Sequence, residues 1–155
     1  MPLERVKLKE RYKPSFPSAE WFQAYGDELS RDPEWKVIGK FFTCTYLIDV
    51  SGNRFILTFV DGKLVNVKSN PLIGPLYSKD AWEFAVRAPL DTWKKFMQRI
   101  PPAKYHHFFA VTDAKTPQGM IVEGNMKTVW QNIRALTHAM EFLRTFHNIH
   151  ERRPS

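Results

Sequence analysis

Imidazole and carboxylate groups are the residues of this sequence whose types and spacing come closest to a catalytic or metal site. His106 and His107 are adjacent, and Asp113 follows them in the same segment. Imidazole titrates near neutral pH and binds Zn²⁺ through a ring nitrogen. Neighbouring histidines point apart in a helix or strand, however, and no third ligand follows at a recognisable spacing. We therefore favour packing at or near the surface for this pair, with polar lining at a cavity mouth as the functional alternative.

A second histidine pair and a cysteine give weaker signals. His147 and His150 share one face if their segment is helical, but we expect this tail to fray and to hold no metal. Cys44 stands in the middle of a predicted strand, away from any helix N-terminus or imidazole that would lower its pKa. This position predicts a buried, structural thiol rather than a nucleophile.

The motifs that mark the large enzyme classes are missing from the sequence. It has no Walker loop, no dinucleotide-binding glycine fingerprint, no G-x-S-x-G, no H-E-x-x-H and no C-x-x-C. His138 with Glu141, and Glu141 with Arg144, are interpreted as a solvated helix face. We expect neither a cofactor nor a metal. The candidates that remain for proton transfer are Tyr46, His106, His107 and Asp113.

Aromatic and thioether side chains are the more informative set. Twelve Phe, five Trp and five Tyr make 14% of the sequence, a high share for a soluble domain. A cavity lined by such residues binds an apolar molecule by burial alone, at about 25 cal/mol per Å². The lining candidates, chosen by strand and helix face, are Phe42, Tyr46, Phe55, Leu57, Phe59, Trp82, Phe84, Phe96, Met97, Phe108, Met120, Trp130, Ile133 and Met140. Ordinary core packing is the alternative for each of them.

The segment FILTFVDGKLVNVKSNP has apolar residues on both faces of its predicted strands. It predicts a hairpin around its Asp-Gly pair, with Phe55, Leu57 and Phe59 on one face. Ile56 and Val60 make the other face apolar as well. Both faces of the predicted sheet therefore need a cover, which is protein on one side and protein or a bound apolar molecule on the other.

The predicted elements alternate between helices and short strands. Ser18 and the Asp-Pro pair at 32–33 bound a first helix, and β-branched and aromatic residues then predict strand from Trp35 onward. A Pro residue opens a later helix, and Asn125 caps the longest one. The expected elements are an extended arm 1–17, a helix 18–31, strands 35–50, 54–60, 63–68 and 81–87, a helix 89–100, a strand 119–124 and a helix 126–146.

Size and charge restrict the class of protein. The chain has 155 residues, which predicts one domain, here 18–147, between the arm 1–17 and a flexible basic tail 148–155. The formal charge is +7 with a pI near 9.6. Basic residues are densest near both ends and lack the aromatic interleaving of RNA-binding strings, so we expect no nucleic acid and keep an anionic membrane surface as a candidate partner. A single cysteine, no apolar leader and no apolar run of about 20 residues predict a cytoplasmic protein.

The order of these elements resembles the sterol carrier protein type-two superfamily of lipid-transfer proteins. The resemblance is carried by "FVDGKLVNV" in the strand meander, by "AWEFAVRAPLDTWKKFM" and by "GMIVEGNMKTVWQNIRAL", and it covers about residues 18–147. It implies an α+β fold: a five-stranded mixed sheet with helices packed mainly on one face and an apolar tunnel between them. It also implies that a fatty acid, a sterol or a similar hydrophobic molecule is bound there.

Three functions are open at this point. The first is binding and intracellular transfer of a hydrophobic small molecule, released by movement of a mouth segment such as 70–79 or 103–118. The second is a small enzyme acting on an apolar or aromatic substrate in the same cavity. The third is a protein-interaction or dimerisation module with an exposed apolar sheet face. The chain is expected to be a monomer or a homodimer.

Overall fold

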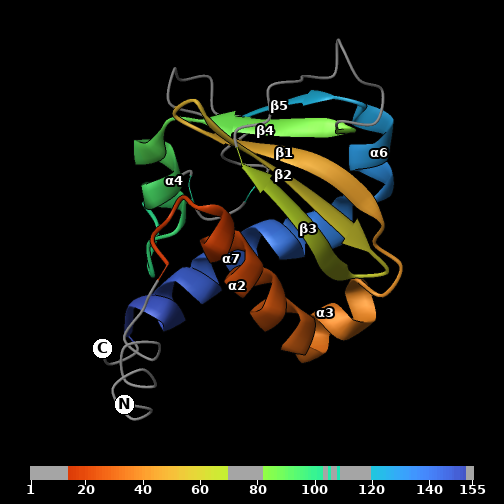
Figure 1. Cartoon of the computed structure of the whole chain (residues 1–155), viewed down its shortest axis with the longest axis horizontal. Coiled ribbons are helices and arrows are strands. Elements are labelled where there is room, and N and C mark those ends of the chain that lie inside the picture. Colours follow the sequence, from red (N-terminus) through yellow and green to blue (C-terminus); the bar gives the residue numbers. More distant parts are fainter. Residues whose placement is uncertain (1–13, 70–81, 103–104, 106–107, 109–119, 153–155) are drawn as a thin grey trace, which may run out of the picture.

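The computed structural model describes residues 14–69, 82–102, 105, 108 and 120–152, and these form a five-stranded mixed sheet with helices against one face (Figure 1). The strand order is β3-β2-β1-β4-β5, and only the central β1–β4 pair is parallel. The strands are β1 (Cys44–Val50), β2 (Asn53–Val60), β3 (Lys63–Ser69), β4 (Phe84–Ala88) and β5 (Ile121–Gly124). The helices are α2 (Ala19–Arg31), α3 (Pro33–Ile38), α4 (Leu90–Phe96), α6 (Met126–Gln131) and α7 (Ile133–Arg152). The predicted fold class is confirmed.

The three-stranded meander is the part that alternation predicted best. In the β1–β2 pair Tyr46 lies opposite Leu57, and in the β2–β3 pair Leu57 lies opposite Val67. All three belong to one buried cluster on the helix side of the sheet. Both turns use a glycine with positive φ, and the Asp-Gly turn at 61–62 stands where it was predicted.

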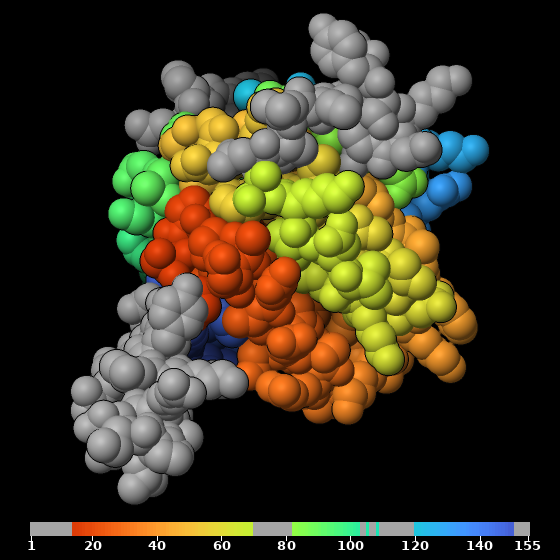
Figure 2. All heavy atoms as spheres, in the orientation of Figure 1, coloured from red at the N-terminus to blue at the C-terminus, as the bar shows by residue number. Residues whose placement is uncertain are grey.

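Helix α2 covers the outer strand of the meander. Ser18 caps it by accepting a hydrogen bond from the backbone N–H of Trp21 at 3.1 Å, as expected for an N-cap serine. Gly26 allows close contact, because a Cβ there would lie 2.6 Å from the side chain of Leu64 on β3. The space-filling view shows α2 in red and orange beside the yellow-green β3 (Figure 2).

The predicted strand from Trp35 is wrong, since residues 33–38 form α3. Asp32 ends α2 and also caps α3, where its carboxylate accepts a hydrogen bond from the backbone N–H of Trp35 at 3.0 Å. Pro33 occupies the first turn, which suits its fixed φ. The Asp-Pro pair is therefore both a stop and a start signal, and strand β1 begins only at Cys44.

Strand β4 and helix α4 correct two further details. Trp82 precedes β4 and packs on the face of the sheet away from the helices, with Leu47, Ile56 and Ala85. It does not share a face with Phe84, as strict alternation predicted, because the strand begins at Phe84 itself. Helix α4 ends at Phe96, before the predicted limit at residue 100, and Ile100 is 79% exposed.

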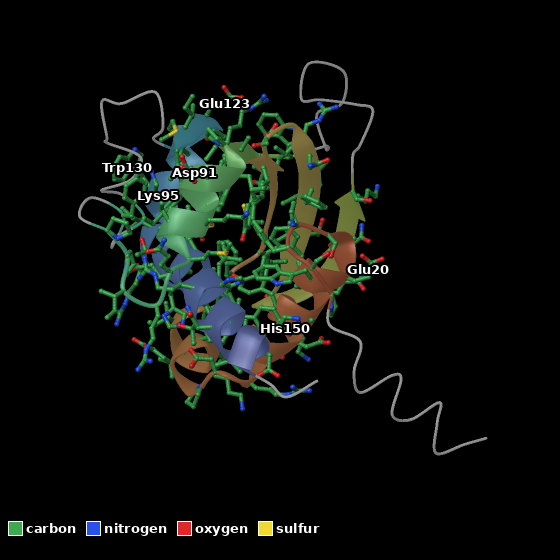
Figure 3. All side chains as sticks on the ribbon, turned by 90° about the vertical axis from the view of Figure 1, so that its left-hand side faces the viewer. Glu20, Asp91, Lys95, Glu123, Trp130 and His150 are labelled. Atoms are coloured by element: carbon green, nitrogen blue, oxygen red, sulfur yellow. The ribbon has the colours of Figure 1, made fainter. Side chains whose placement is uncertain are left out.

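The predicted C-terminal helix is broken in two. Asn125 caps α6 as expected, by accepting from the backbone N–H of Thr128 at 3.3 Å. Asn132 then ends α6, and its side-chain amide donates to the carbonyl of Thr128 at 2.9 Å. Trp130, in the short helix that precedes this break, is 60% exposed (Figure 3).

Helix α7 is the long cover of the sheet and continues to Arg152, past the predicted domain limit at 147. Near its end His150 is buried, with its Nε2 at 3.1 Å from the carbonyl oxygen of Pro14 and its ring stacked on Phe146. The tail that was expected to fray is therefore held at this residue. None of the helices in the described ranges is both long and apolar enough to cross a lipid bilayer.

Candidate ligand site between the sheet and the helices

The predicted lining residues gather mainly in one buried cluster between the sheet and the helices. Three behave differently: Trp82 lies on the opposite face, Trp130 is exposed and Ile133 is half-buried. The residues found together are Phe42, Tyr46, Phe55, Leu57, Phe59, Phe84, Phe96, Met97, Phe108, Met120 and Met140. The strands supply most of the aromatic wall, whereas Met140 lies in α7, Met97 is the C-cap of α4 and Met120 directly precedes β5.

Tyr46 occupies the centre of this wall. It stands on β1, the middle strand, and its ring is stacked between Phe59 at 5.9 Å and Phe84 at 5.0 Å, with interplanar angles of 1° and 4°. The residue is fully buried. Register explains the Phe84 contact, because Tyr46 and Phe84 are direct neighbours in the parallel pair.

The hydroxyl of Tyr46 has no hydrogen-bond partner among the described residues. Burial raises the pKa of this phenol far above its ordinary value of 10, with a smaller contribution from Cys44. Tyr46 therefore keeps its proton at neutral pH and cannot act as a general base. An unpaired buried hydroxyl costs about 1–3 kcal/mol. A polar group of a bound molecule would remove that cost.

Tyr25 of α2 shows the opposite arrangement at the other end of the interior. Its hydroxyl donates a hydrogen bond to the backbone carbonyl of Ala139 on α7. Its ring stacks on Trp21 at 6.0 Å and meets Phe146 at 6.2 Å. Burial raises its pKa too. The hydroxyl of Tyr25 is therefore already paired within the protein.

Cys44 is a structural thiol, as predicted. It is buried on the helix side of β1. Burial raises the pKa of the thiol well above its ordinary value, and the neighbouring Glu83 carboxylate raises it further. The thiolate that a nucleophile requires is therefore disfavoured.

Two hollows on the described surface lie away from Tyr46. One, of about 270 Å³, lies between α2 and the end of α7 and is lined by residues that include Asp27, Arg31 and His150. The other, of about 150 Å³, lies between α3 and the β2–β3 turn and is lined by residues that include Trp35, Lys40 and Lys63. Neither is lined by Tyr46, Phe59 or Phe84. Around Tyr46 the described side chains are packed against one another, and the predicted tunnel stays a prediction.

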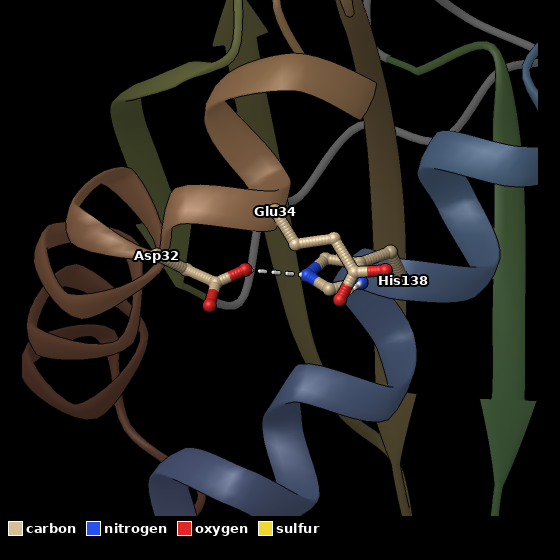
Figure 4. A group of neighbouring side chains, drawn as sticks. All are labelled: Asp32, Glu34 and His138. Atoms are coloured by element: carbon tan, nitrogen blue, oxygen red, sulfur yellow. Dashed lines mark hydrogen bonds and ion pairs between the residues drawn. The ribbon is translucent and has the colours of Figure 1, made fainter.

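A histidine between two carboxylates, which the sequence did not reveal, joins α7 to the α2–α3 junction (Figure 4). Nε2 of His138 lies 2.7 Å from Oδ2 of Asp32, and Nδ1 lies 3.8 Å from Oε2 of Glu34. The imidazole stacks on Trp35 at 5.9 Å. The prediction of a solvated face is wrong for His138, because its partners are more than a hundred positions away and leave no local pattern.

These three side chains are the described group that comes closest to a metal site. Their donors suit Zn²⁺ or Mn²⁺ by type. The arrangement fits a protein-only role better: one carboxylate lies at each ring nitrogen, and the same Asp32 oxygen also accepts from the backbone of Trp35. We interpret the group as a polar clasp between helices.

Arg144 of α7 is a second polar link that was expected to be solvated. Its Nε donates to the carbonyl of Phe96 at 2.7 Å, and a terminal nitrogen donates to the carbonyl of Tyr105 at 2.9 Å. The guanidinium lies 4.8 Å from the centre of the Phe96 ring. Burial lowers its pKa. Arg144 thus fixes the end of α4 against α7.

The other candidates for proton transfer, His106, His107 and Asp113, lie outside the described residues, as do the mouth segments 70–79 and most of 103–118. Among the described candidates only Tyr46 remains. The exposed apolar sheet face expected of a dimerisation module is not present at Leu47, Ile56, Trp82 and Ala85, which are at most 6% exposed.

Comparisons with known proteins agree on the fold. Neither a protein-family model nor a curated protein matches the sequence. A solved structure from Thermus thermophilus, a conserved hypothetical protein named as a candidate sterol carrier protein, matches with a TM-score of 0.61 and 15% identity over 85% of this chain and 90% of that one. Sterol carrier protein 2 matches with 0.59 and 14% identity, over 84% and 98% of the two chains.

A third solved structure, the UbiJ-SCP2 ubiquinone synthesis protein, matches with a TM-score of 0.50 and 15% identity over 93% of this chain and 100% of that one. At such identities the likeness shows a shared fold. The chain has the sterol carrier protein type-two fold that its sequence resembles.

Proposed function

We propose that this protein binds a hydrophobic small molecule, such as a fatty acid or a sterol, between the sheet and the helices and carries it within the cell. The observation on which this rests is the unpaired hydroxyl of Tyr46 inside an otherwise apolar wall. Such a wall supplies affinity by burial, and one polar group supplies orientation. The carboxyl or hydroxyl end of an amphiphile would bond to Tyr46.

The proposal also fits the chemistry of the described residues. Tyr46 stays protonated, and Cys44 is kept as a thiol. Both groups are therefore suited to non-covalent contact rather than to proton abstraction or nucleophilic attack. The fold neighbours named as sterol carrier proteins support the same class of ligand.

A bound ligand would have to displace side chains, because the described interior is packed. Met97, Met120 and Met140 are buried in the same cluster as Tyr46. Unbranched thioethers change rotamer at little cost and refill irregular space. We infer that these methionines move when the ligand enters. A free cysteine that stays reduced suits the cytoplasm as the compartment of such a carrier.

The direct test is ligand content and uptake. Native mass spectrometry of the purified protein should show a co-purified apolar molecule, or uptake of a fluorescent fatty acid by the delipidated protein. Tyr46→Phe should weaken fatty-acid binding about three- to tenfold, the value of one hydrogen bond, and leave binding of the matching hydrocarbon unchanged. Tyr25→Phe is the matched control, since its hydroxyl is already bonded within the protein. A clean apo mass together with no uptake would refute the proposal.

A further inference from the structure

The corner between α3 and the β2–β3 turn combines exposed apolar and basic side chains. Val37 is 78% exposed and Phe41 is 79% exposed. Lys36, Lys40 and Lys63 surround the hollow of about 150 Å³ beside them. These five residues are called the corner patch below. In Figure 2 the orange residues of α3 adjoin the yellow-green residues of the hairpin at this corner.

The charge of the corner patch is uncompensated within the described part of the chain. No ion pair joins Lys36, Lys40 or Lys63 to a described carboxylate. Asp61 is the acidic residue that lines the same hollow, and its carboxylate lies 3.5 Å from the hydroxyl of Thr43. Three cations against one anion favour a negatively charged partner.

The backbone of the corner is anchored, so the exposure of Phe41 does not come from a loose loop. The N–H of Phe42 donates to the carbonyl of Gly39 at 2.9 Å, and the N–H of Gly62 donates to the carbonyl of Phe42 at 2.9 Å. The indole of Trp35 donates to the carbonyl of Gly62 at 2.8 Å. A Cβ on Gly62 would lie 2.5 Å from the carbonyl oxygen of Gly39. The two connections are fixed to each other, and Phe41 is held outward.

Phe41 and Lys40 act as an amphipathic pair. The ammonium of Lys40 lies 5.4 Å from the centre of the Phe41 ring. A ring beside ammonium groups matches the boundary between lipid head groups and acyl chains, where aromatic residues insert and lysines contact phosphate or carboxylate.

The corner patch is also continuous with the candidate ligand site. Trp35 contacts Phe59 with ring centres 6.1 Å apart, and Phe59 is stacked on Tyr46. Trp35 also lines the hollow of the corner patch. One ring contact thus separates the surface hollow from the wall where the ligand is proposed to bind.

We propose that the corner patch docks the protein on a membrane that carries anionic lipids, with Phe41 and Val37 inserted and the three lysines on the head groups. This rests on the proposed function and extends it, because a carrier of hydrophobic molecules must collect them from a membrane. Each lysine near an anionic surface strengthens binding about fivefold, and inserting one phenyl ring strengthens it about tenfold.

Co-sedimentation with vesicles tests this docking. Vesicles of phosphatidylserine and phosphatidylcholine in equal parts should bind the protein, and vesicles of phosphatidylcholine alone should bind it at least about tenfold more weakly. Phe41→Ser should weaken binding about tenfold. Ile100→Ser is the matched control with the same 79% exposure elsewhere on the surface, and it should have no effect. Equal losses for both variants would overturn the proposal.

A charge-matched pair separates the corner patch from the general positive charge of the chain. Replacing Lys36, Lys40 and Lys63 together by Gln should reduce vesicle binding more than tenfold. Replacing the exposed Lys94, Arg99 and Lys127 by Gln changes the net charge equally and should change binding little. If the two triple variants lose vesicle binding alike, diffuse electrostatic attraction explains the result and the assignment of docking to the corner patch is wrong. If Phe41→Ser lowers the molar mass in solution without vesicles, the patch joins two copies of the chain and the membrane assignment is wrong.

Ligand uptake keeps the two proposals apart. The triple lysine variant should take up a fluorescent fatty acid from solution as the parent protein does, and Tyr46→Phe should bind vesicles as the parent does. Vesicle binding without fatty-acid uptake would support the docking surface and refute the carrier. Uptake without vesicle binding would do the reverse.

Discussion

Two buried tyrosines divide the interior into regions of different character. Tyr25, at the α2–α7 end, bonds to a backbone carbonyl and is surrounded by packed aromatic rings. Tyr46, at the centre of the sheet, is equally buried and its hydroxyl has no described partner. Folded proteins pair nearly all buried polar groups. The contrast assigns a structural role to the region around Tyr25. It marks the region around Tyr46 as the place where a polar group of a ligand would supply the missing hydrogen bond.

The largest expected effect on stability comes from removing one aromatic ring from each of the two regions. Phe84→Ala beside Tyr46 and Phe146→Ala beside Tyr25 should each lower the free energy of unfolding by about 3–5 kcal/mol. Only the Phe84→Ala cavity adjoins the unpaired hydroxyl, so a fatty acid should restore its stability and leave Phe146→Ala unaffected. Urea unfolding with and without the fatty acid measures this. Equal rescue of both variants would remove the distinction between the regions.

Alkaline pH should destabilise both regions. The pKa values of Tyr25 and Tyr46 are raised by burial, so above pH 10 the unfolded chain loses these protons while the folded protein keeps them. The free energy of unfolding is unaffected by the ionisation of these two groups below the pKa of the unfolded chain. Above it, the free energy of unfolding falls by about 1.4 kcal/mol per pH unit for each tyrosine. Cys44 adds a similar loss that begins near its ordinary pKa of 9.0.

Unfolding by urea across this pH range, together with tyrosinate absorbance of the folded protein, checks the slope. Replacing either tyrosine by Phe should reduce the pH dependence of the free energy of unfolding by the contribution of one group, about 1.4 kcal/mol per pH unit. A folded protein whose five tyrosines all ionise at their ordinary pKa would contradict the burial on which both regions depend.

Removing single hydroxyls gives a smaller and sharper comparison. Tyr25→Phe leaves the carbonyl of Ala139 without its donor and should lower the free energy of unfolding by about 1–2 kcal/mol. Tyr46→Phe removes an unsatisfied group from the ligand-free protein and should be neutral or stabilising. Thermal unfolding of delipidated samples measures both. A larger loss for Tyr46→Phe would show that its hydroxyl is satisfied in the protein.

The smallest effect is expected at the polar clasp outside both regions. His138→Gln keeps one amide near Asp32 and should cost less than about 1 kcal/mol, whereas His138→Ala should cost about 1 kcal/mol because the bond is partly exposed to water. Zn²⁺ titration by calorimetry provides a second reading. Tight binding that both variants abolish would show that the clasp is a metal site and not only a link between helices.

Prediction from sequence succeeded where short-range patterns decide the structure. Alternation and an Asp-Gly turn located the meander, and capping residues located the starts of α2 and α6. It failed where one residue ends one helix and caps the next, or where a helix ends inside a segment that was predicted to be continuous. Asp32 ends one helix and begins another, and Asn132 ends α6 within the helix that was predicted for 126–146.

The candidate site was predictable in composition but not in detail. Strand faces correctly placed Tyr46, Phe59 and Phe84 on the helix side. Whether the hydroxyl of Tyr46 finds a partner depends on residues far along the chain, as does the pairing of His138 with Asp32. Such contacts leave no spacing in the sequence from which to infer them.

The parallel pairing of β1 with β4 also sets the order in which the protein can be completed. The meander needs only neighbouring residues and can form as soon as Ser69 has left the ribosome. Strand β1 then waits for Phe84 of β4 on one side and for part of its apolar cover from α7, the last of the described helices along the chain. Until α7 has been synthesised, the apolar helix side of a nascent meander is partly uncovered, and a chaperone or an early-bound lipid would protect it from aggregation.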